Sequence, residues 1–155
     1  MKITNILHED AILVNMPGSN KDEIINAIVD LAGKSDKIKD LDKVRQAIFD
    51  REKIMSTGVG KGFAIPHGKC EAITDVVAAF ATTEESIDYE SLDNEPVRLV
   101  FLLIGKDKLV ASHIKYLSRI SRLMNKDDFR AKLLQATSPK EVFSIFEEEE
   151  KLMGE

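Results

Sequence analysis

The chain has 155 residues, of which 43% are hydrophobic and 32% are charged, and it carries a net charge of −5 at pH 7. This composition is typical of one globular domain with its own core, and the acidic balance argues against nucleic-acid binding, which needs a basic surface. The absence of a membrane-length apolar run or a signal-peptide core, together with a single cysteine, predicts a cytoplasmic protein that does not insert into membranes.

The chain begins with a predicted strand and helix. Residues 11–15 form a short apolar run that ends at Pro17-Gly18, which is typical of a strand followed by a turn. Asn20 and Glu23 match a helix N-cap and its partner three residues later. Apolar residues then follow at helical spacing, and Gly33 indicates where this helix ends.

A second helix is predicted from about Asp40 to Arg51 or Glu52, with apolar residues at helical spacing on its buried face. Arg51 then lies at the C-terminal end of this helix. A cation is favourable at that position in any protein, so the pattern alone leaves open that Arg51 is an ordinary solvated helix end.

Glycines alternate through the next segment, at Gly58, Gly60 and Gly62. This segment is too flexible for a helix and too poor in side chains for a core strand. Glycine permits positive φ and close approach of the backbone to a ligand, and such a segment can turn backbone N–H groups toward an anion.

Residues 63–65 are predicted to form a short apolar strand. Pro66 favours an extended conformation in the residue before it and removes one N–H donor from a sheet. We therefore expect the strand to stop at His67, which would face a groove at the end of the sheet, and the chain to turn away at Gly68.

Residues 76–82 and 99–105 are predicted strands that are apolar on both faces, which indicates helices on both sides of a sheet. Ser112 is a plausible N-cap that places His113 in the first turn of a helix, and Asp127 opens another helix. Residues 138–141 are a strong helix start, with Pro at the first position. We interpret the acidic run at 147–150 as a solvated helix face.

This order of elements predicts an α/β fold in which a mixed β-sheet is sandwiched between helices on both faces. Residues 1–155 are expected to form a single domain. The pattern of apolar residues does not determine the order of the strands in the sheet.

Two blocks of the chain resemble the enzyme IIA domains of the bacterial phosphoenolpyruvate-dependent phosphotransferase system, fructose/mannitol class, including its nitrogen-related branch. The resemblance covers nearly the whole chain, and the two blocks occur in the order found in that family. The first comprises Arg51-Glu52, residues 56–60 and residues 62–68; the second comprises Pro96-Val97, residues 100–103, and His113 with Leu117.

The resemblance implies that His67 is phosphorylated and that His113 and Arg51 support it. A neutral imidazole is a good nucleophile near pH 7, a helix N-terminus favours a neutral His113, and arginine offers a planar donor fork for phosphate. Phosphate-binding groups are expected at Ser56, Thr57 and Gly58, next to the active histidine. Which ring nitrogen of His67 accepts the phosphoryl group is left open.

Other interpretations of these residues are weaker. Without the resemblance, a histidine in the context of His67 is more often a loop residue than a nucleophile. A histidine at the position of His113 is at least as often an ordinary surface residue of a helix as a functional one. His67 and Cys70 have a metal-like spacing, but a zinc site needs about four ligands, so we predict no metal. We also predict no cofactor, because the glycine segment lacks the ending of a P-loop and the frame of a dinucleotide fingerprint.

Two functions remain, and both fit the family. In the first, the protein accepts a phosphoryl group from the carrier protein HPr and passes it to an EIIB domain for sugar uptake. In the second, a nitrogen-related regulatory protein has its phosphorylation state read by partner proteins, without sugar transport. Either function requires an exposed rim around His67 for protein partners, for which Val59, Phe63 and Leu109 are the candidates.

Overall fold

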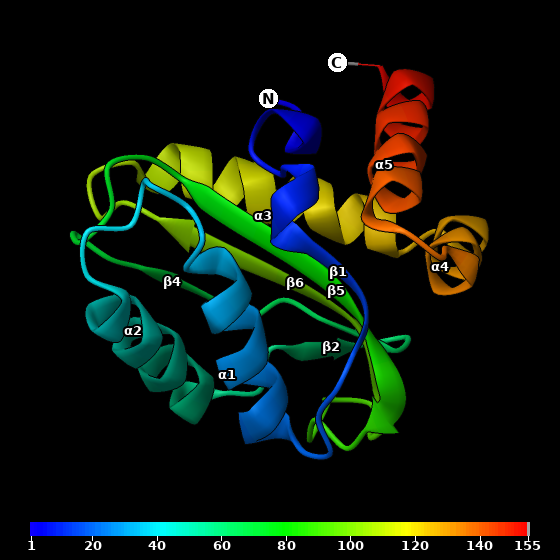
Figure 1. Ribbon diagram of the computed structural model, residues 1–155, viewed down its shortest axis with the longest axis horizontal. Helices are drawn as coiled ribbons and strands as arrows, with labels where there is room; N and C mark the ends of the chain where they lie inside the picture. The colour runs from blue at the N-terminus through cyan, green and yellow to red at the C-terminus, as the bar shows by residue number, and fades with distance from the viewer. Residues whose placement is uncertain (155) are drawn as a thin grey trace.

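A mixed six-stranded sheet forms the centre of the molecule in the computed structural model, which describes residues 1–154 (Figure 1). The order is β1-β5-β6-β3-β2, and β4 also pairs with β6. β5 and β6 are antiparallel, whereas β1 runs parallel to β5, and β3 and β4 run parallel to β6. The strands are β1 Ile12–Met16, β2 Gly58–Gly60, β3 Phe63–Ala64, β4 His67–Lys69, β5 Val77–Ile87 and β6 Val97–Gly105.

Helices cover both faces of this sheet. On one face lie α1 (Lys21–Ala32) and α2 (Leu41–Ile54); on the other lie α3 (Val110–Met124), α4 (Asp127–Gln135) and α5 (Pro139–Met153), with two short 3₁₀ turns at Ile3–Asn5 and Glu9–Ala11 (Figure 1). Each face has its own hydrophobic core. The predicted fold class is therefore confirmed, and the central strands are apolar on both faces because each face is covered.

The starts of three helices follow from side chains that cap them. The side chain of Asn20 accepts a hydrogen bond from the Glu23 N–H at 2.9 Å, as predicted for α1. Asp40 caps α2, and Ser138 accepts from the Glu141 N–H at 3.1 Å at the start of α5. The end of α2 differs from the expectation, since the helix continues to Ile54 and Arg51 lies in its last turn.

The glycine segment forms a short edge strand, in agreement with the expectation that it is neither a helix nor a core strand. β2 pairs antiparallel with β3, and the turn between them contains Lys61 and Gly62, both with positive φ. At Gly58 a Cβ atom would collide with the Ser91 hydroxyl. Glycine is needed here because neighbouring groups occupy the space of a side chain and because the turn is left-handed.

The prediction that the strand stops at His67 and that the chain turns at Gly68 is wrong. The break occurs at Pro66, whose carbonyl accepts from the Leu103 N–H at 3.1 Å, and His67 opens a new strand, β4. Gly68 lies inside β4, where a Cβ atom would meet the Ala47 carbonyl of α2 at 3.3 Å. Proline interrupts the ladder because it has no N–H, but pairing with β6 resumes at once.

The predicted N-cap of α3 is also wrong. The helix begins at Val110 with Leu109 at the N-cap position, and Ser112 lies inside it. The His113 N–H bonds to the Leu109 carbonyl at 3.1 Å, so His113 closes the first full helical turn. No side chain caps this end, so a search for a capping residue could not locate it.

The acidic run of α5 is only half solvated. Glu147 and Glu148 are exposed as predicted, but the side chains of Glu149 and Glu150 are buried. Lys126 pairs with Glu149 at 2.8 Å. Because a charged carboxylate is buried only with partners, the prediction of a solvated face is wrong at these two positions.

Glu150 connects the two ends of the chain. Its carboxylate accepts from the backbone N–H groups of Ile3 at 2.7 Å and Thr4 at 3.0 Å, and from Arg119 Nε at 2.7 Å. Glu150 is 1% exposed and Arg119 is 6% exposed. The carboxylate thus satisfies both a buried cation and two N–H groups of the N-terminal 3₁₀ turn.

Candidate functional site

Two histidines from different elements meet at one end of the sheet. His67 is the first residue of β4 and pairs with Leu103 of β6. His113 projects from α3 and lies against Gly105, the last residue of β6. Their ring centroids are 5.7 Å apart, with the ring planes tilted by 48°. The structure therefore brings together the two histidines that the sequence singled out.

The hydrogen bond of His67 determines which of its ring nitrogens carries the proton. Its Nδ1 atom lies 2.7 Å from the Ile65 carbonyl oxygen. A carbonyl can only accept, so Nδ1 must be the N–H donor in this contact. In the neutral ring, Nε2 then holds the lone pair.

His113 has the opposite arrangement. The side chain is buried, and its Nδ1 atom has no hydrogen-bond partner among the described residues. It packs so closely on Gly105 that a Cβ atom there would lie 2.5 Å from Nδ1. Buried N–H groups without an acceptor are rarer in proteins than buried acceptors without a donor, so we assign the proton of the neutral ring to Nε2.

Both rings are kept neutral, mainly by burial. Burial is the largest cause that lowers the pKa of His113 from 6.5 to about 4, and repulsion from His67 and Lys69 contributes to the same shift. Burial also lowers the pKa of His67, with a smaller contribution from Arg51, while the Ile65 carbonyl and Glu52 act in the opposite direction. A neutral His67 is nucleophilic, so its reactive form persists to lower pH than that of a free imidazole.

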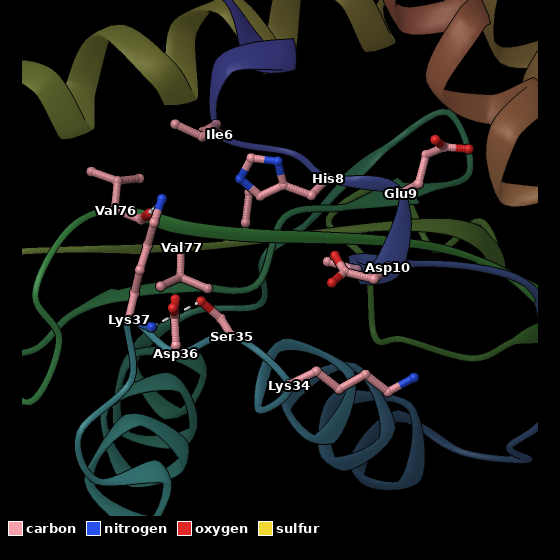
Figure 2. A pocket seen from close by; sticks show the side chains of 12 residues that line it. Ile6, His8, Glu9, Asp10, Lys34, Ser35, Asp36, Lys37, Val76 and Val77 are labelled. Atoms are coloured by element: carbon pink, nitrogen blue, oxygen red, sulfur yellow. Dashed lines mark hydrogen bonds between the residues drawn. The ribbon is translucent and has the colours of Figure 1, made fainter.

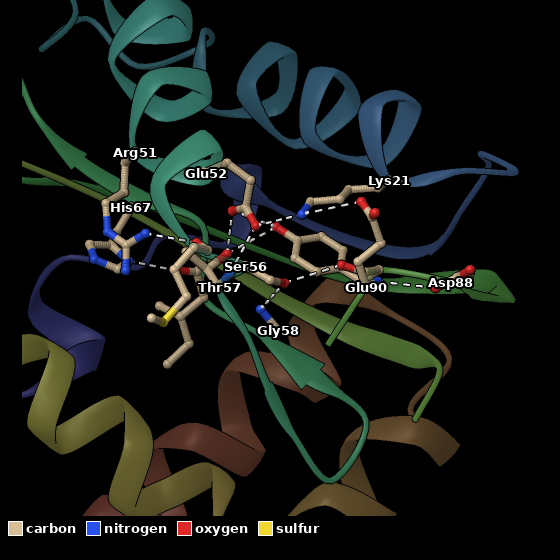
Figure 3. Close-up of polar contacts among 12 residues, drawn as sticks. Lys21, Arg51, Glu52, Ser56, Thr57, Gly58, His67, Asp88 and Glu90 are labelled. Atoms are coloured by element: carbon tan, nitrogen blue, oxygen red, sulfur yellow. Dashed lines mark hydrogen bonds and ion pairs between the residues drawn. The ribbon is translucent and has the colours of Figure 1, made fainter. Parts of the chain in front are cut away.

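Arg51 supplies a cation to this site from the last turn of α2 (Figure 3). Its side chain is partly buried, and Nη1 donates to the Met55 carbonyl at 2.8 Å. The charge is close enough to His67 to lower its pKa. This contact uses Nη1, and the guanidinium has further N–H groups that could donate to a phosphate.

The three predicted phosphate-binding residues lie together at the start of β2, and their polar groups already have partners. The Ser56 hydroxyl donates to the Tyr89 carbonyl at 3.2 Å and accepts from the Gly58 N–H at 3.1 Å. The Thr57 hydroxyl donates to Glu52 Oε1 at 2.5 Å. Their role as phosphate ligands stays a prediction.

Sequence reasoning missed the residues that hold this segment. Glu52 is buried behind Thr57, and Tyr89 and Lys21 complete the cluster (Figure 3). Glu52 directly follows Arg51 in the first block of the family resemblance, and its place in that block could have marked it as a residue of the site. Lys69, two residues beyond His67 and thus on the same side of β4, was missed as well.

Apolar side chains are exposed on the two elements that carry Arg51 and His113. Of the predicted rim, Val59 and Leu109 are exposed, but Phe63 is 3% exposed and belongs to the core. Phe63 is buried because β3 pairs with β6 inside the sheet. Further exposed apolar residues flank the site, at Ile54 and Met55 after Arg51 and at Val110 and Ile114 beside His113.

A separate cavity of about 730 Å³ lies at the start of β5, between the N-terminal segment and the connection from α1 to α2 (Figure 2). Val76 and Val77 form its apolar floor, and charged side chains such as Lys34 and Asp10 surround it. None of the predicted site residues lines it. No helix within residues 1–154 is long and apolar enough to cross a membrane.

The structure is that of an α/β sandwich protein with two histidines close together at one end of its sheet. Residues 5–149 match the family described as "Phosphoenolpyruvate-dependent sugar phosphotransferase system, EIIA 2". The chain belongs to this family, and the resemblance seen in its sequence is thereby confirmed.

Similar proteins come from both branches of the family. A fructose-specific EIIA component of Haloferax volcanii is 33% identical over 94% of this chain and 95% of its own length. A nitrogen regulatory protein of Bradyrhizobium diazoefficiens is 35% identical over 94% of both chains. A fructose-specific EIIABC component of Bacillus subtilis is 34% identical over 97% of this chain, which spans only 24% of that protein.

Solved structures share the same fold. The nitrogen regulatory protein IIA-Ntr of Neisseria meningitidis superposes with a TM-score of 0.86 and 29% identity, covering 93% of this chain and 98% of that one. Mannitol enzyme IIA of Escherichia coli, in complex with phosphorylated enzyme IIB, gives a TM-score of 0.78 and 20% identity over 92% of this chain and 99% of that one.

Proposed function

We propose that the protein is a phosphocarrier in which His67 accepts a phosphoryl group from phospho-HPr and passes it to an EIIB domain. The Nε2 lone pair attacks phosphorus, a new N–P bond forms, and the N–P bond to the HPr histidine breaks, with the leaving imidazole keeping the electron pair. In the second transfer an EIIB side chain, usually a cysteine thiolate in this class, attacks the same phosphorus and His67 leaves.

One observation carries this proposal: two histidine rings lie next to each other, and the contacts of each ring favour a proton on a different nitrogen. His67 directs its proton to the Ile65 carbonyl at 2.7 Å, which leaves Nε2 free to attack. His113, with its centroid 5.7 Å away, has its unpaired Nδ1 buried and its Nε2–H available as a donor to a phosphoryl oxygen. A nucleophile beside a neutral donor is the arrangement that phosphoryl transfer requires.

The exposed apolar side chains on either side of the histidines support transfer between proteins. HPr and EIIB both carry the phosphoryl group on a protein side chain, so they must pack against the surface around His67. Ile54 is 79% exposed and Ile114 is 58% exposed, which is unusual for isoleucine in a helix. Apolar rims of this kind mark protein-interaction sites.

The regulatory function is the second candidate. It is favoured by the similarity to nitrogen regulatory proteins, which extends over nearly the full length of both chains. In that case His67 takes up the phosphoryl group in the same way, but its phosphorylation state is read by a partner protein and no sugar is moved.

The proposal is tested by incubating the protein with phosphoenolpyruvate, enzyme I and HPr and measuring its intact mass under alkaline conditions. We expect the gain of one acid-labile phosphoryl group. Adding a fructose- or mannitol-type EIIB domain should remove it if the protein serves transport. A stable phosphoprotein in the presence of each EIIB tested supports the regulatory candidate, and no phosphorylation by HPr contradicts both.

The supporting roles of His113 and Arg51 make a further prediction. His113→Phe keeps a ring in the buried site but removes the Nε2–H donor. A hydrogen bond to a charged group contributes about 1.5–3 kcal/mol, and about 1.4 kcal/mol is tenfold in rate, so transfer from phospho-HPr should slow by roughly 10- to 100-fold. Arg51→Lys should also slow transfer, because lysine keeps the charge but loses the planar fork.

These rates are measured by rapid quench at saturating phospho-HPr, after circular dichroism has verified folding. Arg45→Lys is the matched control, because Arg45 lies on the same helix but contacts Asn26 and Asp30. Wild-type rates for both site variants would remove His113 and Arg51 from the mechanism and leave His67 alone.

A further inference from the structure

A buried carboxylate lies directly behind the active-site segment. Glu52 is 7% exposed, and both of its oxygens accept hydrogen bonds from one residue: Oε2 from the Thr57 N–H at 2.8 Å and Oε1 from the Thr57 hydroxyl at 2.5 Å. Thr57 is thus held at its backbone and its side chain together. This two-point contact fixes the position of its peptide more firmly than one hydrogen bond would.

Lys21, which Figure 3 labels, and Tyr89 complete the surroundings of this carboxylate. Lys21 Nζ pairs with Glu52 Oε2 at 2.9 Å and lies 4.9 Å from the centre of the Tyr89 ring. The Tyr89 hydroxyl is 3.3 Å from Glu52 Oε1 and 3.0 Å from the Thr57 hydroxyl. Burial and the Glu52 charge raise the pKa of Tyr89, so its hydroxyl keeps its proton and acts as a donor.

A chain of hydrogen bonds leads from this cluster to the reactive ring. The Thr57 carbonyl accepts from the Ile65 N–H at 3.0 Å, and the Ile65 carbonyl accepts from His67 Nδ1 at 2.7 Å. The path from Glu52 to His67 therefore runs through the backbone of two residues, Thr57 and Ile65, each of which uses its N–H on one side and its C=O on the other. Such linked hydrogen bonds orient one another, because fixing the N–H of a residue also fixes the position of its C=O.

We propose that Glu52 is a positioning residue for phosphoryl transfer: through Thr57 and Ile65 it holds His67 in the Nδ1–H tautomer, with Nε2 unprotonated. Glu52 does not contact the phosphoryl group in this proposal. It acts on the nucleophile in the way that outer partners of a histidine fix the tautomer of a metal ligand. The proposal rests on the proposed function of His67.

The first test uses the unaltered protein. Two-dimensional ¹H–¹⁵N correlation of the histidine ring nitrogens at pH 7.5 distinguishes a protonated from an unprotonated nitrogen. We expect His67 to show a protonated Nδ1 and an unprotonated Nε2. A His67 ring protonated at Nε2 in the unaltered protein would overturn the proposal directly, whatever the variants do.

The second test compares Glu52→Gln with Glu90→Gln. Both lose a carboxylate that faces Lys21, but Glu90 is exposed and 3.7 Å from Nζ, and it has no contact with Thr57. Glu52→Gln should show a mixture of His67 tautomers. It should also slow transfer at saturating phospho-HPr by roughly 10- to 100-fold, with little change in the half-saturating HPr concentration. Glu90→Gln should match the unaltered protein in all three measurements.

A purely structural role predicts a different result. Glu52→Gln would then lower the denaturation midpoint but leave His67 in one tautomer and the saturated rate unchanged, and this outcome would overturn the proposal. If Glu52→Gln does not fold, the double variant Lys21→Met/Glu52→Gln also removes the partly buried cation that has lost its Glu52 partner, and it is judged by the same two readouts. Failure of HPr to phosphorylate the unaltered protein would refute the proposed function, whereas the tautomer comparison would still decide the role of Glu52.

Discussion

A His67→Ala variant is expected to take up no phosphoryl group from phospho-HPr while keeping its fold. In the proposed mechanism the unprotonated nitrogen of His67 attacks phosphorus, and the neighbouring His113 ring donates to a phosphoryl oxygen. Alanine removes the atom that forms the N–P bond, so the rate should fall below detection and not by a graded factor. Intact-mass analysis under alkaline conditions measures the uptake.

The matched control is His8→Gln, because His8 is exposed and lies in the N-terminal segment beside the separate cavity. This variant should be phosphorylated like the unaltered protein. Peptide mapping should locate the modification at His67, and NMR of the phosphorylated protein should find phosphorus on Nε2. Persistent labelling of His67→Ala would show that another residue is the acceptor.

A Glu150→Ala variant is expected to lose about 3–5 kcal/mol of unfolding free energy, which is typical when one partner of a buried ion pair is removed. The change leaves the Arg119 guanidinium buried without its carboxylate, and it leaves the N–H groups of Ile3 and Thr4 without an acceptor. Urea unfolding followed by circular dichroism measures the loss. A decrease of this size is a large part of the stability of an ordinary domain.

Glu148→Ala is the control for this prediction, because Glu148 lies two residues away on the same helix and is exposed. Surface substitutions of this kind usually change stability by no more than about 0.5 kcal/mol. Equal effects of the two substitutions would mean that the Glu150 contacts contribute nothing beyond helix propensity.

Local signals in the sequence predicted much of the fold. The caps at Asn20 and Ser138 are correct, because a capping bond joins residues that are three apart in the chain. The start of α3 was misplaced because Leu109 has no capping side chain, and a nearby serine imitated the signal. The solvated face predicted for Glu149 and Glu150 was wrong because their partners lie far away in the sequence, where no local pattern can indicate them.

For the candidate site too, some features could be predicted from the sequence and others could not. His67, His113 and Arg51 were predicted by their resemblance to a family motif, and the structure brings the two histidines together. The proton positions could not be predicted, since they depend on which carbonyl lies beside His67 and on what packs against His113. The buried Glu52 was missed because charged residues next to an arginine at a helix end are usually solvated.

The contact of Glu150 with the N-terminal 3₁₀ turn has a consequence for how the chain folds during synthesis. Ile3 and Glu150 are separated by 147 positions, and β1 pairs with β5, so Ile3 and β1 must wait for distant partners during synthesis. Closing such long loops costs entropy before any contact forms, which slows folding. We expect the nascent chain to remain incomplete until α5 has left the ribosome. Until then the core between the sheet and helices α3, α4 and α5 would lack Phe146 and Val142. The apolar residues that β5 and β6 contribute to this core would then be exposed.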